Sequence, residues 1–271
     1  MKLPAITIIT PSLNQGHYIE DNILSVKNQH YPDVEHLIID GGSVDKTLSV
    51  LQRFEKRLKW ISELDKGQSD AVNKGFMRAS GEIIGWINAD DFLLPGALYK
   101  VADFFCRYPK TKAVIGDLLV VSESGEPVKV IEARRYTHNY LLNEATGIIQ
   151  PSMFFRRVLI KKAGYLDTGL NYSMDYDFFL RITLHSVIEY LPETLAAFRK
   201  NPNAKTSRGT YYFALERLKI RKRYGGGLLA PAGRDAIYII LTEPLRRIVW
   251  VRCAIRHGRC ILHNLFCRKR I

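Results

Sequence analysis

The segment from Gly81 to Pro95 constrains the fold most, because it joins a short apolar run to a pair of carboxylates. The apolar residues Ile83 to Ile87 lead directly into the polar cluster Asn88 to Asp91. A short apolar run bounded by turn residues is typical of a buried strand. Ligands of open α/β sheets bind at the carboxyl ends of the strands. We therefore expect this strand to bring Asp90 and Asp91 to a ligand.

Adjacent carboxylates at such a position favour a hard divalent cation, which in turn binds substrate phosphates. The alternative is structural, because an aspartate often caps the first turn of a helix. A helix is expected to begin near Pro95, so Asp90 and Asp91 fit both interpretations. The two residues alone do not decide between them.

Strands alternate with helices through the first half of the chain. We expect strands at 5–10, 34–39, 58–62 and 83–87, and helices near 19–26, at 44–56 with Ser43 as cap, and from 67 to 78. This alternation predicts a parallel sheet built from right-handed strand–helix–strand units. The carboxyl ends of these strands would then meet along one rim.

Every one of these strands ends in a polar loop, so the rim is predicted to be acidic. The loop residues are Ser12 and Asn14, Asp40 and Asp45, Asp65 and Asp70, and Asp90 and Asp91. Neither the glycine-rich dinucleotide fingerprint nor a P-loop is present. An acidic rim suggests that a phosphate arrives with its own metal ion, while carboxylates also accept hydrogen bonds from a base or a ribose.

Two of these assignments have structural alternatives. Asp40 ends a buried strand, which favours a ligand contact, but an aspartate before Gly41-Gly42 is also common in a solvated turn. Asp70 and Lys74 stand four residues apart on a predicted helix, where they would form a surface ion pair of about 0.2–0.5 kcal/mol.

The second half predicts a helix at 95–105, a hairpin of strands 113–121 and 127–131, and a strand at 148–155. Residues 134–147 are ambiguous. Asp175 and Asp177 open a further helix, where the helix dipole favours negative charge by about 0.3–1 kcal/mol. One of them would instead serve as a general base facing the ligand.

Together these residues resemble a family 2 glycosyltransferase with a GT-A-type fold. The matching motifs occur in the family's order between about residues 5 and 205: Thr10-Pro11-Ser12 with Asn14, Ile39 to Thr47, Asp65 to Gly67, Asp70 to Gly75, Asn88 to Asp91, Gln150 to Ser152, Met174 to Asp177, and Phe198-Arg199. Each motif is weak alone, whereas the ordered set is specific.

The resemblance implies an α/β fold with a Rossmann-like, mostly parallel sheet flanked by helices. It also implies inverting transfer of a sugar from a nucleotide-sugar donor, expected to be UDP-linked, to a saccharide or lipid-linked saccharide, with Mn²⁺ or Mg²⁺ as cofactor. Asp175 would be the catalytic base, and Asp90 and Asp91 the metal ligands. The implied nucleotide-sugar contacts are Pro11, Ser12, Asn14, Asp40, Asp65, Gly67, Asn73, Lys74, Asn88 and Asp90. Asn88 departs from the family pattern, in which many relatives have aspartate.

Charge separates the chain into two predicted parts, a catalytic domain at 1–205 and a basic helical extension at 206–271. The net charge is +13, and residues 205–271 hold 16 Lys and Arg against three Asp and Glu. A predicted helix at 245–266 is basic and amphipathic, which favours an anionic membrane surface. The alternative is a helix packed on the catalytic domain. No nucleic-acid motif accompanies the charge, so nucleic acid is not an expected partner.

The remaining features favour the cytoplasm, with attachment to the inner face of the cell membrane. No apolar leader with a cleavage site precedes the first strand, and no stretch has the roughly 18 uncharged apolar residues of a membrane span. The four cysteines form no CxxC pair, so a zinc site or a disulfide framework is not expected. A catalytically inactive, sugar-nucleotide-binding relative remains the alternative to an enzyme.

Overall fold

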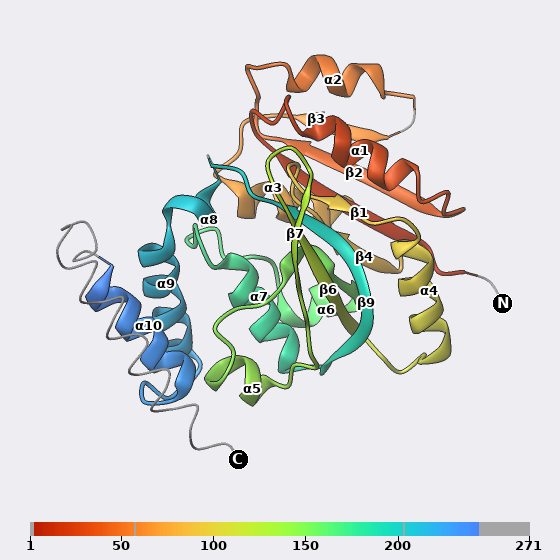
Figure 1. Ribbon diagram of the computed structural model, residues 1–271. Coiled ribbons are helices and arrows are strands. Elements are labelled where there is room, and N and C mark those ends of the chain that lie inside the picture. Colours follow the sequence, from red (N-terminus) through yellow and green to blue (C-terminus); the bar gives the residue numbers. More distant parts are fainter. Residues whose placement is uncertain (1–2, 57, 203, 244–271) are drawn as a thin grey trace.

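The computed structural model describes residues 3–56, 58–202 and 204–243, which fold around one mixed sheet with helices on both faces (Figure 1). The sheet order is β3-β2-β1-β4-β8-β6-β9-β5, and β7 pairs with β6. The strands are β1 Ile6–Ser12, β2 Val34–Asp40, β3 Lys59–Ser62, β4 Ile83–Trp86, β5 Phe92–Leu93, β6 Ala113–Val121, β7 Pro127–Ile131, β8 Met153–Arg156 and β9 Ile188–Arg199. The helices are α1 Ile19–Lys27, α2 Thr47–Arg53, α3 Gln68–Arg78, α4 Ala97–Arg107, α5 His138–Asn143, the 3₁₀ turn η1 Gln150–Ser152, α6 Val158–Ala163, α7 Met174–Thr183, α8 Lys205–Arg208, α9 Thr210–Arg223 and α10 Pro231–Thr242.

The first four strands, β1 to β4, are parallel, as the alternation of strands and helices predicts. β1 pairs with β2 and β4, and β2 pairs with β3. The register sets Ser12 beside Asp40 and Asp40 beside Ser62, so the ends of three strands lie next to each other. This edge of the sheet is the predicted rim.

The second half adds antiparallel pairs. β8 runs antiparallel to both β4 and β6, and the predicted hairpin of β6 and β7 is confirmed. The sequence analysis did not include β9, a long strand parallel to β6. Its register shifts where Pro192 interrupts it, opposite Gly116. Proline removes a ladder donor and is rare inside strands, which hides this strand from pattern analysis.

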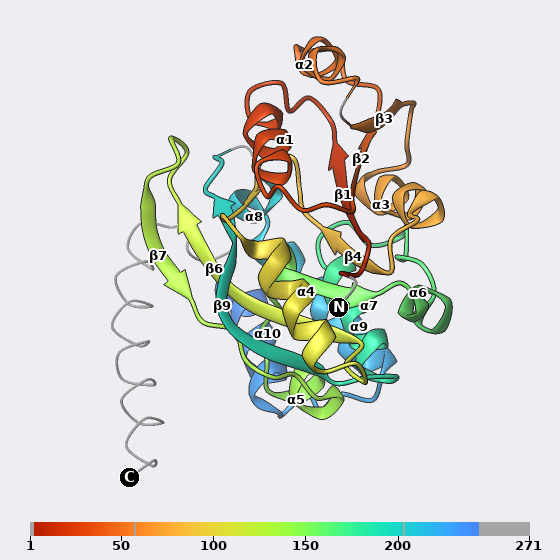
Figure 2. The same cartoon turned by 90° about the vertical axis from the view of Figure 1, so that its right-hand side faces the viewer.

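Two apolar layers lie on opposite faces of the sheet. α1 and α4 cover one face, and α3, α6 and α7 cover the other (Figure 2). Because side chains alternate along a strand, neighbouring residues of β4 enter different layers. Ile83 packs in the α4 layer with Phe154, and Ile84 packs in the α7 layer with Phe155.

Several predicted element boundaries are wrong. α2 begins at Thr47 rather than Val44, because Asp45 accepts the Thr47 amide and Ser43 Oγ donates to Asp40 instead of capping the helix. α4 begins at Ala97, two residues after Pro95. Of the predicted strand 148–155, only the end is a strand, because η1 occupies its middle.

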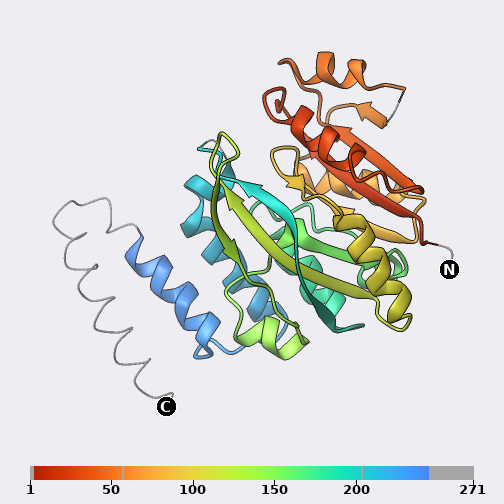
Figure 3. The ribbon, with the colours of Figure 1, turned by 45° about the vertical axis from the view of Figure 1, so that its right-hand side comes forward.

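Of the C-terminal helices, α9 packs against α7, and α10 packs against α9 and α5 (Figure 3). α9 lies within the predicted helical extension 206–271, and its residue Ile220 is buried in the same apolar layer as α7. The predicted amphipathic helix 245–266, and with it Cys253, Cys260 and Cys267, lies outside the described residues. Within the described ranges, no helix has the length and apolar character needed to cross a membrane.

Candidate functional site

A cavity of about 720 Å³ opens at the predicted rim. Its walls come from the end of β1, the start of α3, the end of β4, the start of α7, the segment after β9, and α9. Eight of the predicted site residues line it: Pro11, Ser12, Asn14, Asp65, Gly67, Asn88, Asp90 and Asp175. Motifs that are far apart in the sequence therefore surround one space.

The part of the cavity next to β1 offers polar groups with unused capacity. Ser12 is 4% exposed, and its Oγ has no hydrogen-bond partner among the described residues. Asp65 lies close over Gly41, where an added Cβ would stand 2.4 Å from the carboxylate. Gly67 has φ +109°, a conformation that other residues adopt only with strain. Asp65 Oδ1 accepts the Gly67 amide at 2.8 Å, which fixes the start of α3.

Asp40 supports this wall from behind rather than lining it. It is 0% exposed, and its carboxylate accepts hydrogen bonds from Ser43 Oγ at 2.5 Å and Ser62 Oγ at 2.7 Å. The amides of Gly42 and Ser43 also donate to Asp40. These hydrogen bonds hold the loop after β2, and the contact between Asp40 and a nucleobase stays a prediction.

Asn73 and Lys74 also lie outside the cavity lining. The Asn73 side chain pairs with the backbone of Leu166 through both its Nδ2 and its Oδ1, at 2.9 and 2.8 Å. Lys74 forms ion pairs with Glu63 at 3.0 Å and with Asp70 at 3.4 Å. These partners match the structural alternative for Lys74, and the nucleotide contacts of both side chains stay predictions.

The carboxylates after β4 point in different directions. Asp90 lines the cavity, whereas Asp91 is 1% exposed and accepts the backbone amide of Arg199 at 3.0 Å. Burial raises the pKa of both, and the charge of Asp90 raises the pKa of Asp91 further. Asp91 thus fastens the turn after β4 to the end of β9, and its role as a second metal ligand stays a prediction.

The donor set fits a divalent ion only as a companion of a phosphate ligand. Asn88 Oδ1 accepts hydrogen bonds from Gln68 Nε2 at 2.8 Å and Trp86 Nε1 at 3.1 Å, so its lone pairs are occupied. Across the described ranges, no cluster of three His, Cys, Asp or Glu side chains has the spacing of a metal site. Asp90 is the carboxylate of this pair that lines the cavity, and Mg²⁺ often binds through one carboxylate and substrate phosphates.

Asp175 faces the cavity from the first turn of α7. Burial raises the pKa of this carboxyl, and the positive charge of Arg217 opposes that rise. Asp177 lies deeper, where it is 1% exposed and pairs with Arg181 at 2.9 Å. Of the two carboxylates that open this helix, Asp175 is the one available to a ligand.

Glu216 of α9 holds the loop that precedes Asp175. Its carboxylate accepts the backbone amides of Asn171, Tyr172 and Ser173 at 3.0, 2.8 and 2.8 Å. The start of α7 thereby depends on a helix that lies beyond the motifs in the sequence.

The family model of glycosyl transferase family 2 matches residues 7–164, which is more than half of the chain. The chain belongs to glycosyl transferase family 2. Asp175 and α9 lie outside the matched region, whereas Asp65 and Asp90 lie within it.

Proteins of several bacteria are similar to this chain. A putative teichuronic acid biosynthesis glycosyltransferase of Bacillus subtilis is 36% identical over 48% of this chain and 53% of its own length. A poly-beta-1,6-N-acetyl-D-glucosamine synthase of Staphylococcus epidermidis is 25% identical over 62% and 43%, respectively. An uncharacterized glycosyltransferase of Rickettsia typhi is 23% identical over 72% and 64%. The chain thus spans between 43% and 64% of the length of these three relatives.

Solved glycosyltransferase structures share the fold. The structure of S. aureus TarS 1–349 in complex with UDP-GlcNAc has a TM-score of 0.64 at 19% identity, covering 90% of this chain and 72% of that chain. The mannosyltransferase PcManGT from Pyrobaculum calidifontis, in complex with GDP-Man and Mn²⁺, has a TM-score of 0.62 at 17% identity, covering 96% and 81%. The α/β fold predicted from the motifs, the GT-A type, is confirmed by these similarities.

Some residues of this family 2 cavity were not singled out by the sequence. Its aromatic walls include Trp86, Tyr172 and Phe213 besides Phe198 of a quoted motif, and Lys205 adds a cation near the position of Asp65. Aromatic residues at these positions are indistinguishable from core residues in a sequence. Gln150 belongs to a quoted motif. Its side-chain amide donates a hydrogen bond to the Trp86 carbonyl, which explains why a glutamine follows the apolar residues Ile148 and Ile149.

Proposed function

We propose that this chain transfers a sugar from a nucleotide-sugar donor to a hydroxyl group of a saccharide or lipid-linked saccharide, with inversion at the anomeric carbon. The observation that carries the proposal is the single cavity lined by Ser12, Asp65, Asp90 and Asp175. Its volume of about 720 Å³ is within the range of small-molecule sites.

The donor is proposed to lie across the carboxyl ends of β1 and β4. The Ser12 hydroxyl can donate a hydrogen bond to a base or ribose or accept one from it, and the Asp65 carboxylate can accept hydrogen bonds from base N–H or ribose hydroxyl groups. The aromatic ring of Trp86 supplies an apolar wall. Asp90 is the carboxylate that we propose as ligand of the metal ion bound to the donor diphosphate. A UDP-linked donor is our preference, because the TarS structure that shares this fold holds UDP-GlcNAc.

Asp175 is proposed as the general base. Its carboxylate would accept the proton of the acceptor hydroxyl as that oxygen attacks the anomeric carbon, a role that typically contributes about 10²–10⁴-fold in rate. Glu216 would keep this carboxylate in place by fixing the preceding loop. A bound divalent ion would supply Lewis-acid neutralisation of the leaving diphosphate, with Asp90 as its ligand from the protein.

The acceptor is proposed to be a cell-surface saccharide or its lipid-linked precursor, on the basis of what the similar bacterial proteins are named for. Residues 1–205 would form the catalytic domain, and the basic residues beyond would meet the inner face of an anionic membrane. α9 is assigned to support of the catalytic helix, because Arg217, Arg221 and Arg223 of its basic run are used within the protein.

A thermal-shift screen tests the donor site. UDP-, GDP- and dTDP-sugars would each be added with and without Mn²⁺, and a UDP-sugar is expected to raise the melting temperature most. Asp65→Asn should remove that rise. Asp70→Asn is the matched control, because Asp70 pairs with Lys74 outside the cavity. No shift with any nucleotide sugar would contradict the proposal, while binding without sugar transfer would favour the inactive relative.

A further inference from the structure

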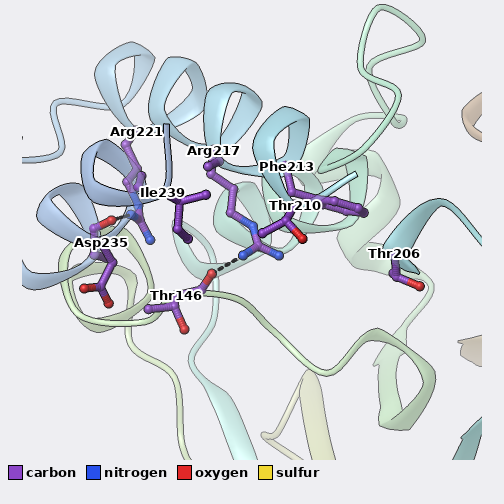
Figure 4. A pocket seen from close by; sticks show the side chains of 11 residues that line it. Thr146, Thr206, Thr210, Phe213, Arg217, Arg221, Asp235 and Ile239 are labelled. Atoms are coloured by element: carbon purple, nitrogen blue, oxygen red, sulfur yellow. Dashed lines mark hydrogen bonds between the residues drawn. The ribbon is translucent and has the colours of Figure 1, made fainter. Parts of the chain in front are cut away.

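A second cavity adjoins the proposed catalytic cavity on the side of α9. It has a volume of about 250 Å³ and lies between α9, α10 and the loop that contains Thr146 (Figure 4). Thr206 and Phe213 line both cavities, so the two spaces meet at these residues. A group bound in the second cavity would therefore stand next to an acceptor in the first.

The lining of the second cavity combines hydroxyl groups, one aromatic ring and charge. Thr146, Thr206 and Thr210 supply hydroxyls, and Phe213 supplies a ring face. Sugars present both hydroxyls and an apolar face, so this lining suits a saccharide. Two arginines and one aspartate face the space, which leaves the lining with a net positive charge: Arg217, Arg221 and Asp235.

The two arginines differ in how much of their hydrogen-bonding capacity the protein uses. Arg221 is 2% exposed and donates to Tyr176 Oη and to the carbonyls of Ala145 and Ala232. It is a structural residue. Arg217 donates to the Thr146 carbonyl, but its Nε has no hydrogen-bond partner within the described part of the chain. A buried donor without a partner is uncommon in folded proteins.

The position of Arg217 links the two cavities. Its guanidinium lies 5.6 Å from the centre of the Phe213 ring, which separates the cavities, and its charge acts on Asp175. Gly147 stands beside the guanidinium, where an added Cβ would lie 3.2 Å from it. The arrangement keeps a planar cation at the boundary, and guanidinium groups match carboxylate and phosphate oxygens well.

We propose that the α9–α10 cavity binds an anionic group, a carboxylate or a phosphate, carried by the acceptor saccharide, and that Arg217 recognises it. The inference rests on the proposed glycosyl transfer. The Asp235 carboxylate would accept hydrogen bonds from hydroxyl groups of the same sugar residue. The acceptor class is thereby narrowed to acidic glycans.

Binding of small model sugars to the UDP-loaded protein tests this site without any need for turnover. Methyl β-D-glucuronide, glucose 6-phosphate and neutral methyl β-D-glucoside would be titrated by saturation-transfer NMR. At least one acidic probe should bind roughly tenfold more tightly than the glucoside, as expected for one charge-assisted contact. The acidic probe that binds more tightly shows whether the site recognises a carboxylate or a phosphate. Equal affinity for all three would overturn the proposal.

Substitutions show which residues cause the preference for an acidic probe. Arg217→Gln should abolish it, and Lys219→Gln, an exposed cation on the same helix, should leave it unchanged. Asp235→Asn removes a like charge from an exposed position and should strengthen binding of the acidic probe severalfold, which keeps the test decisive if Arg217→Gln fails to fold. A preference that survives Arg217→Gln, or no response to Asp235→Asn, would refute the assignment.

The two proposals fail separately. Loss of UDP-sugar binding in the thermal-shift screen would contradict the glycosyltransferase function itself. Normal UDP binding with no preference for acidic probes would contradict only the acceptor site. If Arg217 acts solely as the counter-ion of Asp175, Arg217→Gln will change the pH profile of turnover and leave the probe affinities as they were, which also overturns the inference.

Discussion

Replacing Glu216 by alanine tests whether α9 is part of the catalytic fold. The carboxylate accepts three consecutive backbone amides, those of residues 171–173, directly before α7. Ser173 is 0% exposed, so its amide cannot turn to water when the carboxylate is removed. Tyr172 is partly buried and Asn171 is exposed, and their amides lose less.

The expected cost follows from this difference in burial. A buried amide left without a hydrogen-bond partner costs about 1–3 kcal/mol. A hydrogen bond to a charged group contributes about 1.5–3 kcal/mol, and less when several amides donate to the same carboxylate. We therefore expect Glu216→Ala to lower the free energy of unfolding by about 2–4 kcal/mol. Glu216→Gln, which keeps one oxygen acceptor, should lose about half as much. The total stability of a domain is typically about 5–15 kcal/mol, so the loss is large.

Urea unfolding followed by circular dichroism measures these values, with Glu55→Ala as the control at an exposed glutamate beyond α2. Sugar transfer should also decline in Glu216→Ala at temperatures where the protein is folded, because Asp175 follows the released loop. A loss below about 0.5 kcal/mol, the usual size for a surface substitution, would refute the view that α9 supports the catalytic helix.

Three further predictions concern other buried charges. Arg199→Met should cost about 3 kcal/mol in urea unfolding, because Arg199 is 5% exposed and donates to Asp21 and to the carbonyls of Asp90 and Glu123; a cost below 1 kcal/mol would argue against it. Burial alone would raise the pKa of Glu35, but hydrogen bonds from Lys59, Ser80 and Thr7 lower it from 4.5 to about 2. Glu35 should therefore add stability above pH 4.5 that disappears as the pH falls towards 2, so the gap in unfolding free energy between wild type and Glu35→Gln should shrink at pH 3; a constant gap would count against the assignment. Because burial raises the pKa of Asp175 and Arg217 opposes the rise, turnover should fall with decreasing pH through a midpoint above 3.8, and Arg217→Gln should move that midpoint upward; an unmoved midpoint would contradict the pairing.

The parallel half of the sheet could be predicted because each strand is short, apolar and followed by a polar turn. The rim residues Ser12, Asp65 and Asp90 were predicted for the same reason, since the ends of parallel strands share one edge. Asp175 was predicted from its place at the start of a helix and from the family resemblance. The same reasoning from strand ends placed Asp40 at the rim, and Asp40 is indeed the last residue of β2 there. A strand's last side chain faces either the cavity or the loop behind it, and the hydrogen bonds of Ser43 and Ser62 decide for the loop.

Tertiary partners account for the other differences. Asn73 stands on the polar face of its helix, but the backbone that occupies its amide comes from Leu166, 93 residues later. Asp91 is likewise engaged by Arg199, 108 residues away. A sequence pattern carries no information on such distant pairs. Within the predicted basic extension 206–271, Arg221 is buried and bonded to Tyr176, a contact that the charge pattern does not indicate.

Turnover of a donor sugar by an Asp175→Asn variant tests the central claim most directly. Release of the sugar from a UDP-sugar would be followed in wild type and variant, with UDP affinity measured in parallel by calorimetry. General-base catalysis predicts that turnover falls about 10²–10⁴-fold while UDP affinity stays nearly unchanged. Turnover close to that of the wild type would show that Asp175 is not the base and would contradict the account of this cavity.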